Sequence, residues 1–162
     1  MAIFAALVLA APASVGSQPS PPAAIASAVG DCWAAVGPGS VDQTVLRQRG
    51  WQPGKFTGAP AGVPTSLHPF GKSGANVILL VTASAGKPTC SVVSRVESAA
   101  AVSTAAQAVQ QALVAADPEV KTARSGKSIV FLALPRIATL DATGTKDKPG
   151  VRIVAGYNAE QK

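Results

Sequence analysis

The amino-acid sequence predicts an α+β domain, a two-layer sandwich in which an antiparallel sheet of about four or five strands carries its helices on one face. Three segments have apolar residues at helical spacing, and strand-like apolar runs follow them, joined by short turns. Short turns between strands favour antiparallel pairing. The 162 residues suffice for one domain, and 48% hydrophobic residues is far above the disordered range. The expected order is therefore α-α-β-β-α-β-β-β.

The three helical segments differ in how clearly their ends are marked. From Ala23 to Val36, apolar side chains recur every three or four residues, with Cys32 on the same face. A second helix begins at Ser40, where Ser-x-x-Gln has the form of a capping box, and ends near Gly50. The segment from Ser98 to Ala116 has the most regular apolar stripe, and an Asp-Pro pair ends it.

The strands follow from runs of apolar residues and from alternation. Residues 76–83 contain VILLV, which is typical of a central strand, and 89–97 alternates with Cys90 on one face. The stretch 52–74 is rich in Gly and Pro and is expected to be a long surface connection. The expected strands are a short edge strand at 67–70, then 76–83, 89–97, 128–134, 137–142 and 151–157.

The first residues have the form of a signal peptide. The apolar run from Ala2 to Ala11 is too short to span a bilayer and suits a signal-peptide core, with cleavage after Ala13 or Ser17. No Lys or Arg precedes the run, and the alternative is an apolar first helix of the domain. The expected segments are a signal peptide at 1–17, a flexible leader at 18–22, one domain at 23–158 and a C-terminal tail at 159–162.

The two cysteines, Cys32 and Cys90, match no metal or redox motif by their spacing. A lone, well-separated pair in an oxidising compartment usually forms a bridge. Because Cys32 lies on the apolar face of a helix and Cys90 on the inward face of a strand, the predicted disulfide would join helix to sheet across the core. The alternative is two buried free thiols.

Two stretches resemble small exported bacterial proteins of uncharacterised function. The first is the pattern Cys32…Gly-x-Val-Asp…Leu…Gly-Trp51, and the second is TGTKDKP…VRI at 143–153. The resemblance covers most of the chain after residue 17. It implies export and a disulfide-bridged α+β domain. We expect the exported chain to lie in the bacterial periplasm or outside the cell and to have no transmembrane helix. The resemblance assigns no catalytic residue and does not indicate a ligand.

Motifs for catalysis and metal binding are weak. His68 is the only histidine, so composition excludes a site of several histidines, and no nucleophile elbow supports a Ser-His-Asp triad. A surface histidine is the simpler interpretation. The two GKS tripeptides at 71–73 and 126–128 match the end of a P-loop but lack its first glycine, so we expect them to be turns. The sequence predicts no metal and no cofactor.

Positive charge is the remaining functional signal, with a net charge of +6. If the basic residues converge in the fold, they could bind an anionic surface, and otherwise they are solvated. Only 4% of residues are aromatic, which disfavours nucleic acid as a partner. The basic residues form two clusters along the chain, namely Lys121, Arg124 and Lys127, and then Lys146, Lys148 and Arg152.

Two functional hypotheses follow. The first is an exported, non-enzymatic binding or envelope-associated protein whose partner is an anionic envelope polymer or another protein. The second is a small hydrolase or transferase with a site under the 52–74 loop, in which His68 works with Ser66, Ser73 or a nearby acid.

Overall fold

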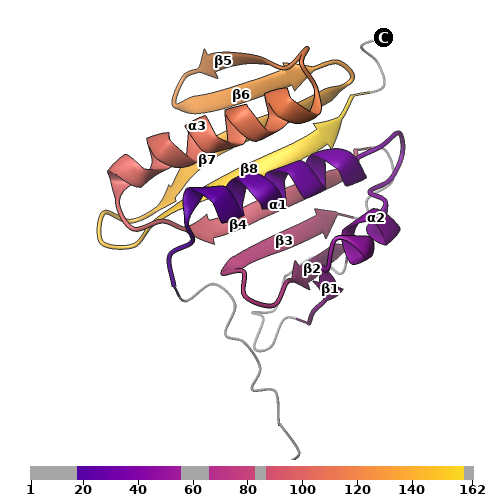
Figure 1. The fold of residues 1–162 in the computed structure, drawn as a ribbon, viewed down its shortest axis with the longest axis horizontal. Coiled ribbons are helices and arrows are strands. Elements are labelled where there is room, and N and C mark those ends of the chain that lie inside the picture. The colour runs from indigo at the N-terminus through magenta and orange to yellow at the C-terminus, as the bar shows by residue number, and fades with distance from the viewer. Residues whose placement is uncertain (1–17, 56–65, 83–86, 159–162) are drawn as a thin grey trace, which may run out of the picture.

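The structure is a computed structural model that describes residues 18–55, 66–82 and 87–158 (Figure 1). The predicted signal peptide, its cleavage points and the predicted C-terminal tail lie outside the described residues. No helix in the described part is long and apolar enough to cross a membrane. The helices are α1 (Pro22–Ala35), α2 (Gln43–Gln48) and α3 (Ala99–Ala116). The strands are β1 (Gln52–Pro53), β2 (Leu67–Gly71), β3 (Val77–Thr82), β4 (Thr89–Arg95), β5 (Lys121–Ser125), β6 (Ser128–Ala133), β7 (Arg136–Gly144) and β8 (Pro149–Tyr157).

The predicted α+β class is confirmed, but the predicted number of strands was too low. One antiparallel sheet contains eight strands in the order β1-β2-β3-β4-β8-β7-β6-β5. β1 has two residues, and β5 has the sequence KTARS with all five residues exposed. Neither strand has the alternation of apolar and polar residues by which a half-buried strand is recognised. The segment predicted as an edge strand is β2, and it pairs on both sides.

The strand order contains a repeat that the residues do not display. Each half of the chain is a helix followed by a four-strand meander, from α1 to β4 and from α3 to β8, with α2 added in the first half. The halves meet where β4 pairs antiparallel with β8, at Val92 and Ile153. Leu79 pairs with Val92 as Leu140 pairs with Ile153. These equivalent pairs indicate that an approximate two-fold axis, perpendicular to the sheet, relates the two halves.

The core lies between one face of the sheet and the pair α1 and α3, which lie side by side on that face (Figure 1). Because directly paired residues share a face, a continuous apolar row crosses the sheet from β2 to β7. α1 adds Ile25 and Val29, and α3 adds Val109 and Leu113, all fully buried. The row consists of Phe70, Leu79, Val92, Ile153 and Leu140, each at most 1% exposed.

Two local details differ from the sequence prediction. Helix α2 is capped by Asp42, not by Ser40, because the Asp42 carboxylate accepts hydrogen bonds from the backbone N–H groups of Thr44 and Val45. Ser20, expected in a flexible leader, is instead 4% exposed. Its backbone N–H donates a hydrogen bond to the backbone carbonyl of Arg95, and its hydroxyl donates one to the backbone carbonyl of Asn76. The chain is thus fixed to the sheet before α1 begins.

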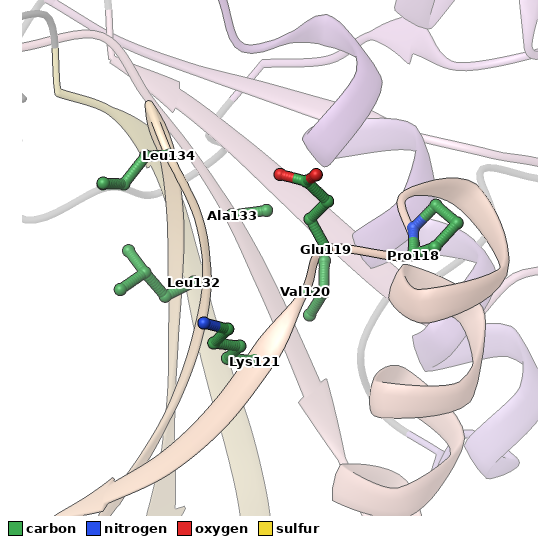
Figure 2. Close-up of a pocket in the computed structure, with 7 residues that line it drawn as sticks. All are labelled: Pro118, Glu119, Val120, Lys121, Leu132, Ala133 and Leu134. Carbon is green, nitrogen blue, oxygen red and sulfur yellow. The ribbon is translucent and has the colours of Figure 1, made fainter. Parts of the chain in front are cut away.

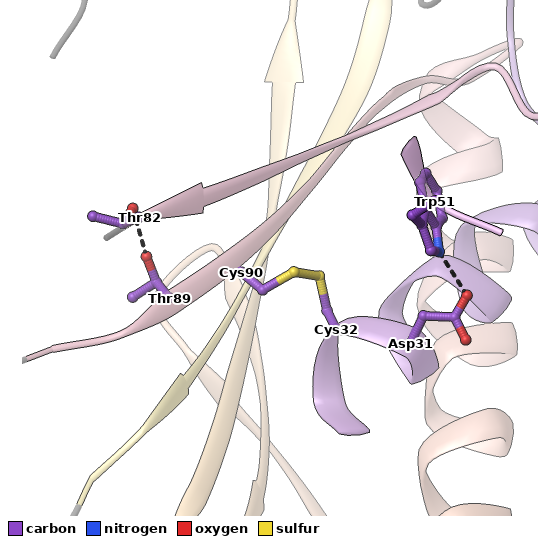
Figure 3. The surroundings of a disulfide bond; sticks show 6 residues. All are labelled: Asp31, Cys32, Trp51, Thr82, Thr89 and Cys90. Carbon is purple, nitrogen blue, oxygen red and sulfur yellow. Dashed lines mark hydrogen bonds between the residues drawn. A yellow bond between two sulfur atoms is a disulfide. The ribbon is translucent and has the colours of Figure 1, made fainter. Parts of the chain in front are cut away.

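The disulfide Cys32–Cys90 is present, as predicted (Figure 3). It joins α1 to the central strand β4, with the two Cα atoms 5.5 Å apart and 58 residues of sequence separation. Both side chains are fully buried. The bond therefore connects the helical layer to the sheet within the core.

Removing the disulfide should destabilise the protein strongly. A loop of this length restricts the unfolded chain by about 4 kcal/mol in the entropic description. We expect the Cys32→Ala/Cys90→Ala variant to lose most of that free energy of unfolding in urea titrations. Wild-type protein kept in reductant is the control and should behave like the variant. Equal stability of variant and oxidised wild type would contradict a structural role for the bond.

Candidate interaction surface

The structure brings five of the six predicted basic residues to one end of the sheet. The β5–β6 turn at 126–127 and the β7–β8 turn at 145–148 lie at this end, because Ile129, just after the first turn, pairs with Leu140 near the end of β7. We call this the hairpin end. It carries Arg124, Lys127, Lys146, Lys148 and Arg152, all exposed. Lys121 is also exposed but lies at the opposite end of β5.

Arg152 differs from the other basic residues of the hairpin end because it forms an ion pair with a carboxylate. Its guanidinium lies 3.4 Å from the carboxylate of Asp141 on β7, and that carboxylate also accepts a hydrogen bond from the Ser128 hydroxyl. Asp147 is a second carboxylate at the hairpin end, in the β7–β8 turn. The exposed positive charge therefore comes chiefly from the lysines of the two turns and from Arg124.

His68 has no catalytic partner among the residues that the structure describes. It lies exposed on β2, opposite Val81 of β3. Within the described residues no carboxylate or hydroxyl is hydrogen-bonded to it, and the same part of the chain holds no group of three metal-ligating side chains. The loop residues 56–65, under which the hydrolase site was expected, lie outside the described residues.

Both GKS tripeptides have structural roles. Lys72 places its ammonium 5.7 Å from the centre of the Trp51 ring, a cation–π contact. Gly126 and Lys127 form the two-residue turn between β5 and β6, and Gly126 has φ +61°, a conformation in which glycine is favoured. Neither tripeptide opens a helix, as a phosphate-binding loop would.

A buried carboxylate on α1 was not predicted as important. Asp31 is 6% exposed and accepts a hydrogen bond from the Trp51 indole N–H at 2.8 Å (Figure 3). Its other oxygen accepts one from Arg49 at 2.7 Å. The contacts join α1 to the residues that follow α2. No spacing rule connects residues twenty positions apart, so only the tertiary fold reveals this network.

Three hollows on the surface follow α3 and the β5–β6 hairpin. The first, about 230 Å³, lies between α3 and β5, and we call it the α3–β5 groove. The second, about 490 Å³, continues along the exposed side of α3 and shares Gln107 and Gln110 with the first. The groove is lined by Ser103, Ala106, Gln107 and Gln110 of α3, Thr122 and Arg124 of β5, and Ile129 of β6.

The third hollow, about 450 Å³, lies where the chain leaves α3 and enters β5. Figure 2 shows Pro118 and Glu119 on the α3–β5 connection, and across from them Leu132 and Ala133 of β6 and Leu134 just after that strand. Glu119 and Lys121 supply its charges. The three hollows thus border the same part of the molecule, from the flank of α3 to both ends of β5.

Comparison of the chain with protein-family models, with curated proteins and with solved structures finds no match.

The Asp31 network should contribute to stability. We expect Asp31→Ala to lower the free energy of unfolding by about 2 kcal/mol, because it leaves the buried Trp51 N–H without an acceptor. Asp31→Asn keeps an acceptor and should cost less. The measurement is urea unfolding followed by tryptophan fluorescence.

A double-mutant cycle tests the physical reason. In a Trp51→Phe background the indole donor is absent, so Asp31→Ala should destabilise the protein less than it does in the wild type. An equal cost in both backgrounds would show that the hydrogen bond to Trp51 is not what Asp31 contributes.

Proposed function

We propose that this protein is a non-enzymatic binding domain that acts after export and recognises an anionic partner with its hairpin end. The observation that carries the proposal is the convergence of Arg124, Lys127, Lys146 and Lys148, from two separate hairpins, at one end of the sheet. Neighbouring strands lie about 4.8 Å apart, so the two turns are separated by about 10 Å across the strands, and the β7–β8 hairpin also extends past the β5–β6 turn, because β7 continues from Asp141 to Gly144. Cations gathered at one end of the sheet reinforce one another's field at an extended polyanion that reaches both turns.

The disulfide supports the compartment. A buried bridge between α1 and β4 forms and persists in an oxidising environment, such as the bacterial periplasm or the exterior. The envelope of a bacterium also supplies anionic polymers and proteins as partners. No described aromatic side chain lies in the β5–β6 or β7–β8 turn, which makes base stacking and therefore nucleic acid a poorer match.

Charge reversal at the hairpin end should weaken binding to polyanions. We expect the wild-type protein to be retained on immobilised heparin and Lys146→Glu/Lys148→Glu to elute at clearly lower salt. The variant makes fewer contacts with the anionic groups of the polymer, so its binding releases fewer counterions and is weaker. The measurement is the salt concentration at elution.

The matched control is Lys55→Glu/Lys87→Glu, which changes the net charge equally at two exposed lysines away from the hairpin end. This control should elute close to the wild type. If both double variants shift equally, retention follows net charge and not the hairpin end. If the wild type is not retained at all, the proposed function is wrong.

A further inference from the structure

Among the described residues, none pairs with the outer side of β5, which is therefore an edge of the sheet. It is the last strand in the order, and all five of its residues are exposed. The strand at the other edge, β1, pairs through two residues only. An exposed edge strand presents a row of unpaired backbone N–H and C=O groups to which a further strand can bind.

The hairpin turn determines which backbone groups of β5 are available. Ser125 and Ser128 flank the two-residue turn, and in such a hairpin this pair exchanges both of its backbone hydrogen bonds. Hydrogen bonding alternates along an antiparallel pair. The N–H and C=O groups of Arg124 and Thr122 are therefore directed away from β6, toward an incoming strand.

The side chains of the same two residues line the α3–β5 groove. Thr122 pairs with buried Phe131, and Arg124 pairs with Ile129, so both point to the face that α3 covers. The opposite wall is α3, whose sequence from 99 to 116 contains no charged residue. Arg124 is thus the charged group of the groove, with amide and hydroxyl groups around it.

We infer that an extended, acidic segment of a protein partner binds along β5 as a ninth strand and places alternate side chains in the α3–β5 groove. The inference rests on the proposed function, because the same Arg124 and Lys127 belong to the hairpin end. It specifies the class of partner: a polypeptide that supplies both carboxylates and an extended backbone.

The charges favour this occupant over the other candidates. Lys121, Arg124 and Lys127 lie within a stretch of seven residues, 121–127, that contains no acid. Asp117 and Glu119 precede it, in the connection from α3. Pairing of β5 with β5 of a second copy would place these cations beside the same three cations, which is unfavourable. A polysaccharide or polyphosphate would complement the charge but has no backbone amides for Thr122 and Arg124.

The inference can be tested with a short peptide of about eight residues that alternates threonine and glutamate. Titration into ¹⁵N-labelled oxidised protein should shift the amide resonances of Thr122 and Arg124 saturably and slow their hydrogen exchange. The same peptide N-methylated along its centre keeps its charge but cannot pair as a strand, and should bind at least about tenfold more weakly. A lysine counterpart should not bind.

Two protein variants test the edge itself. Thr122→Pro removes a backbone N–H that faces solvent in the free protein and leaves the β5–β6 bonds in place, as proline in an edge strand does. It should weaken peptide binding by about tenfold without a loss of thermal stability. Thr122→Val is the matched control, because it keeps the N–H group and changes only the side chain in the groove, so it should bind the peptide more tightly than Thr122→Pro does.

The outcomes separate this inference from the proposed function. Equal binding of the N-methylated and unmethylated peptides, or full binding by Thr122→Pro, would overturn the ninth strand while heparin retention still supports an anionic partner. Retention on heparin without saturable peptide shifts at β5 would also overturn it, and would indicate a polymer. Sedimentation showing a dimer that Thr122→Pro dissociates would identify a second copy as the occupant instead. Loss of both heparin and peptide binding would reject the proposed function as well.

Discussion

The pairing of β4 with β8 determines how the two halves of the molecule relate to each other. Seven residue pairs, from Thr89 with Gly156 to Arg95 with Gly150, join two meanders that otherwise form separate sheets. β4 also carries Cys90, so the disulfide holds α1 against the strand on which this pairing depends. A defect here would separate the halves, whereas a defect at β1 or β5 would remove only an edge.

The helices and the inner strands were predictable because they bury one face. α3 shows its stripe at helical spacing, β4 alternates, and the two cysteines fall on inward positions in both elements. The helix–sheet disulfide was predictable for the same reason. β5 was missed because its residues are exposed on both faces, so burial imposes no period on KTARS. The cap of α2 was misplaced because Ser40 and Asp42 both suit that position, and backbone geometry decides between them.

The candidate site was likewise predictable from the sequence only in part. Lys121, Arg124 and Lys127 are neighbours in the sequence and were recognised as a cluster. Their relation to Lys146 and Lys148 depends on strand order, which composition and spacing do not encode. The glutamines of α3 were identifiable as its solvent side, but a polar helix face becomes one wall of a groove only when a strand lies beside it. Asp31 and Trp51 show the same dependence on tertiary contact.

The repeated topology raises the question of polymerisation. A sheet with two equivalent edges, each with unpaired backbone groups, can pair with further copies on both sides and grow into a fibre. In this molecule the symmetry of the strand order does not extend to the edges. The edge at β1 has only two paired residues. The edge at β5 is a full strand, but its positive charges repel those of a second copy. Because the two edges differ, growth of a fibre by repeated edge-to-edge pairing is unfavourable. The domain is better suited to binding one partner strand, at β5.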